Sequence, residues 1–462
     1  LTDKRTTRKV RPIRISILGC TDSLALNFDQ QANTDDGSCN YCNNDASVFV
    51  QLGSELFDPV QDQTGRSTSI SDNGAIIAYS SWINGGYGGN VRIFQNINGQ
   101  WEQLGQDVSN LEFAGGNNFG SAISLSADGY RIAIATDMSS SGGNWSNLTG
   151  KVQVFEWNQS SWVQIGQDLI GDYPHDEFGF SVSFSDDGNR LAIGAPENDG
   201  NGNSAGQVKV FDWNGYQWVQ LGNSIEGQDE SLTGGNYNDG TYMMAGYAVS
   251  FSGDGNKLAV LHRNGYNSSS YIKVFELSGQ TWSLLADRID LSGYHKTIDL
   301  DIDGNTLVVG QGENSSNSSV KVFEFDGANW SQKGSTLFSD DILQNSTLFG
   351  YQVSITDNGD KISISLPEAS NRFISSGYMN SNCFHQRYGA VDIYDWDGSS
   401  WLKTDSINGD IVYAELGDAM SMNADGSTVI VGARDSEFYG TGNDRGFVRV
   451  YQNFCSDNSI IP

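Results

Sequence analysis

Basic residues are scarce in this chain of 462 residues, and their scarcity sets the first limits on what it binds. Lysine and arginine together number 26 against 56 aspartate and glutamate residues, which gives a formal net charge of −30 at pH 7. Because phosphate backbones are bound through Lys and Arg, so acidic a chain is disfavoured as a nucleic-acid binder. The charge suits solubility at high ionic strength, or the binding of cations.

Long apolar runs, prolines and helical periodicity are also rare or missing. No stretch approaches the roughly 18 consecutive apolar residues that a membrane span requires, so we expect no spanning segment. Only 6 prolines occur beside 55 glycines, and 11 Trp, 19 Tyr and 22 Phe give a high aromatic content. No segment repeats its apolar residues with a helical period. This composition favours tight turns and aromatic side chains wedged between sheets, and it argues against helices.

The stretch from Phe178 to Gly222 has the clearest local pattern. It contains four short runs rich in β-branched and aromatic residues, separated in pairs by an Asp-Gly turn at Asp187-Gly188 and an Asn-Gly turn near Asn214. Such turns need residues that tolerate positive φ, and they are the strongest short-range hairpin signal. The stretch therefore predicts one sheet of four antiparallel strands.

This unit occurs seven times along the chain. The first hairpin recurs as STSISDNG, SAISLSADG, SVSFSDDG, AVSFSGDG, TIDLDIDG, YQVSITDNG and DAMSMNADG, at 67–74, 121–129, 181–188, 248–255, 297–304, 351–359 and 418–426. Third strands such as KVQVFEW also recur seven times, and six fourth strands open with Trp101, Trp162, Trp218, Trp282, Trp330 and Trp401. A four-stranded unit repeated about every 40 to 70 residues is typical of a β-propeller. We predict an all-β, seven-bladed propeller of four-stranded blades.

The seventh blade has a third strand, FVRVYQ, but no fourth strand after it. The segment VFVQLG at 48–53 has the fourth-strand pattern, with Phe49 at the tryptophan position. We expect this N-terminal strand to pair with the last blade and close the ring, because closure removes two exposed sheet edges.

The same residues resemble the FG-GAP repeat of integrin-α-type propellers, over about residues 48–452. The best match lies in Phe178-Gly179, in Gly194-Ala195-Pro196 and in GQVKVF at 206–211. Many FG-GAP repeats carry a calcium loop between their first two strands. Here a tight turn such as 185–188 takes its place, so we carry no calcium over to the blades. The turn also departs from the SxDxGxxW pattern of sialidase-type propellers, so that activity is not implied either.

Residues 1–18 are expected to form a basic arm. Six of the chain's 26 basic residues fall within its first 14 positions, namely Lys4, Arg5, Arg8, Lys9, Arg11 and Arg14. One interpretation is that the arm docks on the acidic surface of a neighbouring copy. The other is that it is a disordered remnant of processing at Lys4-Arg5.

Residues 19–47 form a second unit ahead of the propeller. The segment GCTDSLALNFDQQANTDDGSCNYC (19–42) resembles a short module, GCTDxxAxNYDxxATxDDGSC, of secreted and often marine proteins. A segment this short needs a staple, so we expect a disulfide between Cys20 and Cys39. The module also carries a set of hard oxygen ligands that suit Ca²⁺, namely Asp22, Asn27, Asp29, Asp35 and Asp36. The alternative is that these side chains cap local turns.

Two further cysteines flank the strands that should close the ring. Antiparallel pairing of 48–53 with 447–452 brings Cys42 and Cys455 together, so we expect a second disulfide between them. Closing so long a loop is worth roughly 4–5 kcal/mol on the chain-entropy model. Cys383 has no evident partner and is either a free thiol or an intermolecular link. The propeller is thus expected at 48–455, with a C-terminal tail at 456–462.

Eight N-x-S/T sequons fall in expected loops or turns, where a glycan is accommodated: Asn144, Asn147, Asn158, Asn267, Asn314, Asn317, Asn329 and Asn345. Loops rich in Asn and Ser also produce such sequons by chance. Together with the cysteines they predict a secreted glycoprotein, located in the extracellular space or on the surface of a cell or particle.

Function on propellers generally lies on the face with the longer loops or in the central channel. The loop at 367–389 carries the aromatic residues and arginine that binding hot spots favour, and its candidate binding residues are Phe373, Tyr378, Phe384, Arg387 and Tyr388. The alternative is that this loop folds back and buries its own aromatics. A second loop, at 223–246, brings Tyr242, Met243 and Met244 towards the same face.

The sequence contains no motif for catalysis. Neither a GxSxG motif nor a paired CxxC motif occurs. The four histidines lie in or beside expected loops of different blades and lack the spacing of metal ligands: His175, His262, His295 and His385. Adjacent carboxylates carry little weight among 56 acidic residues. We therefore expect no enzyme. A propeller glycoside hydrolase using two loop carboxylates is the weaker alternative.

The sequence as a whole predicts a secreted, non-enzymatic propeller with a structural or adhesive role, which contacts other copies of itself or surface partners. Ca²⁺ is expected only in the N-terminal module. A different hypothesis is that the chain is a recognition module that binds a glycan or peptide on the long-loop face. The fold alone does not decide between them.

Overall fold

A computed structural model of the chain describes residues 18–19, 34–35, 47–58, 63–82, 89–109, 118–137, 149–202, 204–227, 243–264, 269–312, 318–340, 348–369, 387–411, 413–434 and 446–455. The chain divides into two compact units. One takes in Leu1–Val50 and Asn453–Pro462, and it contains the short parallel pair β1 (Leu18–Gly19) and β2 (Thr34–Asp35). The other unit, Gln51–Gln452, contains almost all of the propeller.

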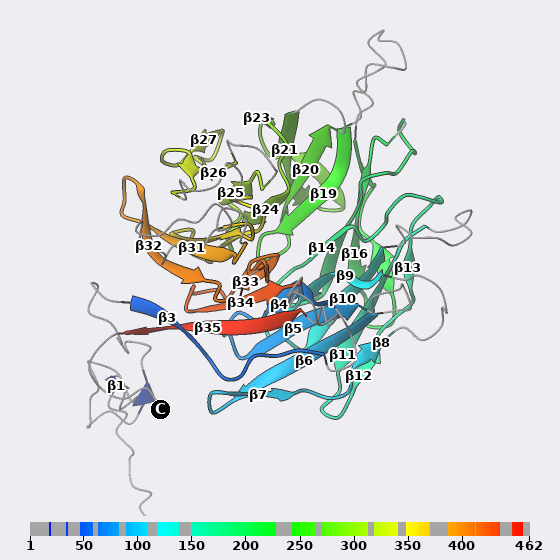
Figure 1. Ribbon diagram of the computed structural model, residues 1–462. Helices are drawn as coiled ribbons and strands as arrows, with labels where there is room; N and C mark the ends of the chain where they lie inside the picture. The colour runs from blue at the N-terminus through cyan, green and yellow to red at the C-terminus, as the bar shows by residue number, and fades with distance from the viewer. Residues whose placement is uncertain are drawn as a thin grey trace, which may run out of the picture. The chain divides into compact units, whose positions relative to one another are not determined.

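Seven antiparallel sheets make up the propeller, and Figure 1 shows them arranged around a central axis. Blade one consists of β4 (Gln63–Ile70), β5 (Ile76–Trp82), β6 (Gly89–Ile97), β7 (Gln100–Gln103) and β8 (Val108–Ser109). Blade two consists of β9 (Asn118–Leu125), β10 (Arg131–Asp137), β11 (Lys151–Trp157), β12 (Trp162–Gln164) and β13 (Leu169–Ile170). Blade three consists of β14 (Ser181–Phe184), β15 (Arg190–Ala195), β16 (Gln207–Trp213), β17 (Trp218–Gln220) and β18 (Ile225–Glu226). Each blade is numbered from its inner strand outwards.

Blades four to seven follow the same order. Blade four consists of β19 (Met243–Phe251), β20 (Lys257–Asn264), β21 (Ser269–Ser278), β22 (Thr281–Leu284) and β23 (Ile289–Ser292), and blade five of β24 (Thr297–Leu300), β25 (Thr306–Gly310), β26 (Ser319–Phe325), β27 (Trp330–Gln332) and β28 (Leu337–Phe338). Blade six consists of β29 (Val353–Ile355), β30 (Lys361–Leu366), β31 (Ala390–Trp396) and β32 (Trp401–Asn408). Blade seven consists of β33 (Ala419–Met422), β34 (Thr428–Ala433), β35 (Phe447–Cys455) and β3 (Ser47–Gln51). The prediction of seven blades is confirmed.

Five blades carry a short fifth strand that the sequence pattern did not predict. After the fourth strand the chain turns back and pairs two to four more residues with the third strand, as β13 does with β11 through Lys151↔Ile170 and Val152↔Leu169. In blade six the long strand β32 covers both pairings by itself, from Trp396↔Trp401 to Ala390↔Asn408.

The tight turn of each first hairpin is held by its own side chains. In blade two, Ser126 Oγ donates to Asp128 Oδ1 (2.6 Å) and accepts from the N–H of Arg131 (3.0 Å), while Asp128 Oδ1 accepts from the N–H of Tyr130 (2.9 Å). Ser185 with Asp187 and Ser252 with Asp254 repeat this geometry. The carboxylates of these turns therefore stabilise the hairpin.

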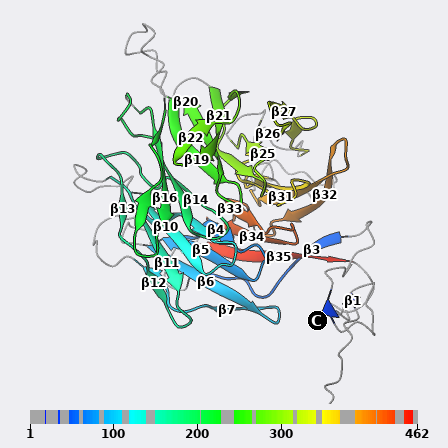
Figure 2. The same ribbon diagram turned by 180° about the vertical axis from the view of Figure 1, so that it is seen from behind.

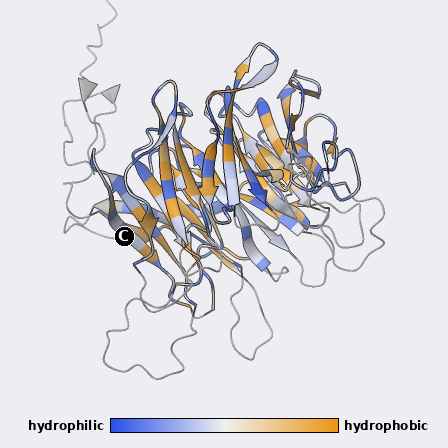
Figure 3. Ribbon diagram, turned by 90° about the horizontal axis from the view of Figure 1, so that it is seen from above, coloured by the Kyte–Doolittle hydropathy of each residue, from blue (hydrophilic) through white to orange (hydrophobic). Residues whose placement is uncertain are grey.

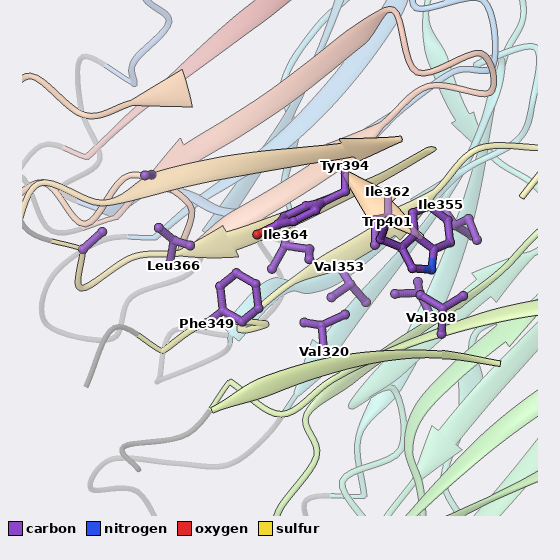
Figure 4. Packing of buried hydrophobic residues seen from close by; sticks show 13 residues of the cluster. Val308, Val320, Phe349, Val353, Ile355, Ile362, Ile364, Leu366, Tyr394 and Trp401 are labelled. Carbon is purple, nitrogen blue, oxygen red and sulfur yellow. The ribbon is translucent and has the colours of Figure 1, made fainter. Parts of the chain in front are cut away.

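The hydrophobic core lies between blades. One cluster joins Val308 and Val320 of blade five to Phe349, Val353 and Ile364 of blade six, and Figure 4 shows these side chains meeting in the space between the two sheets. Figure 3 shows hydrophobic residues concentrated along the strands and hydrophilic residues at many strand ends and turns. Because each cluster draws on two neighbouring sheets, a single blade has no core of its own.

The tryptophan that opens each outer strand reaches the preceding blade. The indole N–H of Trp162 donates to the carbonyl oxygen of Leu104 (2.8 Å), and that of Trp401 donates to the carbonyl oxygen of Lys333 (3.0 Å). The glycine of the preceding blade's WxQxG run leaves room for this ring, since a Cβ on Gly166 (φ +73°) would lie 2.8 Å from Trp218. Trp330 is the exception, because its buried indole N–H has no partner among the described residues.

The N-terminal strand closes the ring, as predicted. Strand β3 is the outer strand of blade seven, in the order β3-β35-β34-β33. The N–H of Leu52 donates to the carbonyl oxygen of Val450 (2.8 Å), and Leu56 exchanges two backbone hydrogen bonds with Val448. Trp101 of blade one donates to the carbonyl oxygen of Leu52 (3.0 Å), the position that other tryptophans take on the preceding outer strand.

The last blade packs against the first. Figure 2 shows β33 and β34 beside β4, and one core cluster joins Ile77 and Tyr79 of blade one to Ile430 and Val450 of blade seven. No helix occurs among the described residues, so none there is long and apolar enough to cross a membrane.

A closed circle of backbone hydrogen bonds links the seven tight turns around the axis. In each turn the N–H of one residue donates to the carbonyl oxygen of its counterpart in the next blade, at 2.8 to 3.3 Å, in the order Asp72, Ala127, Asp186, Gly253, Ile302, Asp357, Ala424 and back to Asp72. This circle holds the seven inner strands at a fixed distance from the axis at their tight-turn end.

Candidate binding site at the central channel

The inner strands of all seven blades line a central channel with a cavity of about 580 Å³. Each inner strand runs towards its tight turn, so the first residue that it gives to the channel lies at the opposite, long-loop end. These first residues are Arg66, Ser121, Phe180, Tyr247, Lys296, Tyr351 and Asp418, and Arg434 lies beside them. We call this set the channel mouth.

In blades one to four, a serine hydroxyl on the channel wall joins the inner strand to the next inner strand. The N–H of Leu125 donates to Ser69 Oγ (3.0 Å), that of Phe184 to Ser124 Oγ (3.1 Å), and that of Phe251 to Ser183 Oγ (3.1 Å). The serine that precedes the last apolar residue of the inner strand is therefore a link between blades.

Blade five has Asp299 where four of the other blades use this serine as a link. Its carboxylate accepts hydrogen bonds from the Ser250 hydroxyl (3.0 Å), the Ser354 hydroxyl (3.2 Å) and the N–H of Ile355 (3.0 Å). Burial raises the pKa of Asp299 to about 6, although these hydrogen bonds act in the opposite direction. The carboxylate is thus a structural link that becomes costly once it ionises.

Replacing Asp299 by the serine of the other blades is expected to change how the stability of the protein depends on pH. Because the folded-state pKa of about 6 lies above the ordinary value of 3.8, the folded protein holds this proton more tightly. The stabilising contribution of Asp299 is therefore complete below about pH 4 and is lost as the pH rises through about 6. Urea unfolding should show that the stability of Asp299→Ser relative to wild type rises by about 1–3 kcal/mol between pH 4 and pH 8.

Asp303→Ser is the matched control, because this neighbouring carboxylate is exposed in the turn of the same blade. It should leave the pH profile of stability unchanged. A stability difference for Asp299→Ser that does not vary with pH would show that the buried carboxylate is not the cause.

The tight-turn end of the channel is acidic. Asp72, Asp186 and Asp357 all belong to the circle of backbone hydrogen bonds there. Burial, followed by the carboxylates of Asp186 and Asp357, raises the pKa of Asp72 to about 6. Among the described residues, which include these aspartates, no group of three His, Cys, Asp or Glu side chains is placed to hold a metal ion.

The channel mouth, by contrast, combines cations with aromatic rings. The Arg66 guanidinium lies 3.4 Å from the centroid of the Trp82 ring, and Lys296 Nζ lies 2.9 Å from the centroid of the Tyr351 ring. Arg263 lies against Tyr247 (4.6 Å) and donates to its hydroxyl group (2.5 Å). Stacking on a ring fixes a guanidinium in one orientation, so these cations are held in place before any ligand arrives.

Asp418 is the carboxylate of the mouth. Its Oδ2 lies 3.3 Å from Arg434 Nε, and the Tyr351 hydroxyl is hydrogen-bonded to it. Burial, followed by Asp418, raises the pKa of the Tyr351 hydroxyl, which therefore stays protonated. The mouth thus presents positive charge, hydroxyl groups and ring faces around a polar cavity, a combination suited to binding an anion that also carries hydroxyl groups.

Most residues of the predicted metal and disulfide sites lie outside the described residues. This holds for Asp22, Asn27, Asp29 and Asp36 and for Cys20, Cys39, Cys42 and Cys383. Asp35 ends β2 and Cys455 ends β35, and only their backbone is described. The calcium site and both disulfides stay predictions.

Two of the eight sequons lie among the described residues. Asn158 and Asn329 are exposed in turns between third and fourth strands, and Asn158 Oδ1 accepts from the N–H groups of Ser160 and Ser161. The other six lie outside the described residues: Asn144, Asn147, Asn267, Asn314, Asn317 and Asn345.

The predicted binding loop is described only at its ends. Arg387 Nη1 lies 2.8 Å from Glu368 Oε1 and 2.9 Å from Glu415 Oε1, so this arginine forms ion pairs across the base of the loop. Tyr388 follows it and donates its N–H to Ala369. Phe373, Tyr378 and Phe384 lie outside the described residues, as does Tyr242 of the second loop.

Sequence reasoning placed one histidine wrongly and missed the mouth. His262 lies within strand β20, fully buried, with its ring stacked on Tyr271 at 4.4 Å, and not in or beside a loop. The mouth residues had a usable signal, because Phe180, Tyr247 and Tyr351 each follow a glycine in register with Gly179. Aligning the seven repeats at that glycine picks out most of the ring.

Comparisons with known proteins concern the fold. Residues 173–211, in blade three, match the FG-GAP repeat. Among solved structures, the hydrazine synthase of Kuenenia stuttgartiensis is similar with a TM-score of 0.51 and 12% sequence identity, over 86% of this chain and 98% of that chain. No curated protein matches the chain in sequence. The repeat and the seven sheets together make this an FG-GAP-like propeller, and the likeness to the synthase shows the fold alone.

Proposed function

We propose that this chain is a secreted, non-enzymatic propeller with an adhesive or structural role, which binds other macromolecules through the long-loop end of its ring. The observation that carries the proposal is the contrast between the two ends of the channel. At the tight-turn end, backbone hydrogen bonds link each blade to the next. At the other end, cations and aromatic rings are oriented around a cavity.

A binding role fits the groups in the channel better than catalysis does. Asp299, a carboxylate on the channel wall, accepts three hydrogen bonds from the wall, so its oxygens serve the contact between blades. His262 is fully buried and stacked on a ring, where no substrate reaches it. FG-GAP propellers generally mediate protein interactions, which supports the same choice.

A building-block role makes a prediction about assembly. The body is strongly acidic and six basic residues lie in positions 1–14, so copies should attract one another through opposite charges. Light scattering of the full chain in calcium should give particles larger than a monomer. Chelation with EDTA should shrink them if the N-terminal module holds Ca²⁺, and deletion of residues 1–14 should shrink them if the arm docks. A stable monomer under all conditions would contradict the building-block role.

A second candidate, glycan recognition, is favoured by one specific observation. The rings of Phe180, Tyr247 and Tyr351 line the same cavity as Ser67 and Ser121. Ring faces that pack on sugar carbons, beside polar groups that reach sugar hydroxyls, are the usual contents of a pocket for a small polar ligand.

A further inference from the structure

Lys296 is one of three cations that line the channel, together with Arg66 and Arg434. It directly precedes the inner strand of blade five, and its Nζ lies over the face of Tyr351, which precedes the inner strand of blade six. Its side chain is partly buried. The charged groups that act on it are Asp418 of blade seven and three cations, Arg434, Arg263 and Arg66, from blades seven, four and one. Positive charge therefore prevails around Lys296 in a protein whose net charge is −30.

The rest of the mouth suits a sugar ring. Tyr247 and Phe180 form a tilted pair with centroids 4.9 Å apart, on the wall next to Lys296. Serine hydroxyls of other blades line the same cavity, and its volume of about 580 Å³ is ample for one or two sugar rings. Acidic side chains of a protein partner would use the cations alone, whereas a sugar acid would also pack beside the rings of Phe180 and Tyr247.

We infer that the channel mouth binds a hexuronate, a six-carbon sugar acid, with its carboxylate against Lys296 and its ring beside the Phe180–Tyr247 pair. This inference rests on the glycan-recognition form of the proposed function and names its ligand class. A carboxylate next to an ammonium group forms a charge-assisted hydrogen bond, which is stronger than one between neutral groups. A neutral hexose offers the same hydroxyls without this interaction.

Binding should depend on pH in one direction. Burial lowers the pKa of Lys296 to about 7; Asp418 acts against this shift, and Arg434, Arg263 and Arg66 add to it. The ammonium form that attracts a carboxylate is therefore present below about pH 7 and is lost above it. The hexuronate carboxylate stays ionised throughout this range, so affinity should follow the charge on Lys296.

Isothermal titration of the full chain with D-glucuronate, and with D-glucose as the neutral counterpart, tests the inference. At about pH 6, glucuronate should bind at least about tenfold more tightly than glucose, and its affinity should fall about tenfold by about pH 8.5. Lys296→Met should weaken glucuronate binding at least about tenfold, while Lys296→Arg should retain binding and remove the pH dependence. Lys151→Met is the matched control, because Lys151 pairs with Asp168 in blade two and is not part of the channel lining; it should bind glucuronate as wild type does.

Three outcomes would overturn the inference: equal affinity for glucose, unchanged binding by Lys296→Met, or affinity for a glutamate-rich peptide in place of glucuronate. Thermal unfolding of each variant shows whether a lost signal reflects lost folding. The building-block role fails separately, through a stable monomer in light scattering, so the two failures are distinguishable.

Discussion

A chain that lacks residues 1–56 should lose at least about 4 kcal/mol of stability and aggregate, whereas a chain that lacks only residues 1–46 should fold. The longer deletion removes β3 and the backbone partners of Val448 and Val450, so β35 becomes an unpaired edge. It also removes the carbonyl oxygen of Leu52 that accepts from Trp101. An exposed, hydrophobic strand edge is a template for aggregation.

A rescue variant separates loss of the strand from other effects of truncation. Because β3 runs antiparallel to β35, residues 47–56 appended after Cys455 through a short turn reach the same position. This permuted chain should recover the unfolding midpoint of the chain that lacks residues 1–46. If the chain without residues 1–56 unfolds at the same midpoint as the shorter deletion, strand β3 does not hold the ring closed.

Phe178→Ala should destabilise the propeller by about 3–5 kcal/mol. This side chain is 1% exposed and fills the space between blades two and three, against Val152, Leu169 and Ile193. The backbone is packed tightly around it, because a Cβ on Gly171 would lie 2.8 Å from that of Phe178. With so little freedom to collapse, the site should keep most of the cavity that the substitution leaves.

Tyr216→Ala provides the matched control from the same blade. Tyr216 is 89% exposed in the outer turn, so removing its ring should change stability by less than about 0.5 kcal/mol. Chemical denaturation of the two variants and wild type gives the comparison. Equal effects would mean that the FG-motif phenylalanine does not hold neighbouring blades together.

The fold was predictable because each blade repeats local signals that do not depend on distant residues. The turn from Ser185 to Gly188 encodes its own hairpin, and the seven copies together require a ring. The closing strand was predictable for a related reason. Phe49 and its neighbours have the sequence pattern of an outer strand, although no first, second or third strand precedes them in the sequence.

The channel was not predictable to the same degree, because its properties arise from register between blades. Asp299 looks like one more acid among 56, and only the structure places it between Ser250 and Ser354. The closed circle of turn hydrogen bonds is likewise invisible in sequence, since its members have different side chains. Lys296 stands outside the FG-type pattern of the other blades, so no motif marks it.

Hydroxyl-radical footprinting with mass spectrometry tests the central claim, that contacts are made at the long-loop end of the ring. The full chain would be labelled alone and with polygalacturonate, an acidic polysaccharide of hexuronate units. We expect Phe180, Tyr247 and Tyr351 at the mouth to become protected, while Tyr130 and Tyr216 at the tight-turn end keep their reactivity. Protection of Tyr130 and Tyr216 with an unchanged mouth would contradict it.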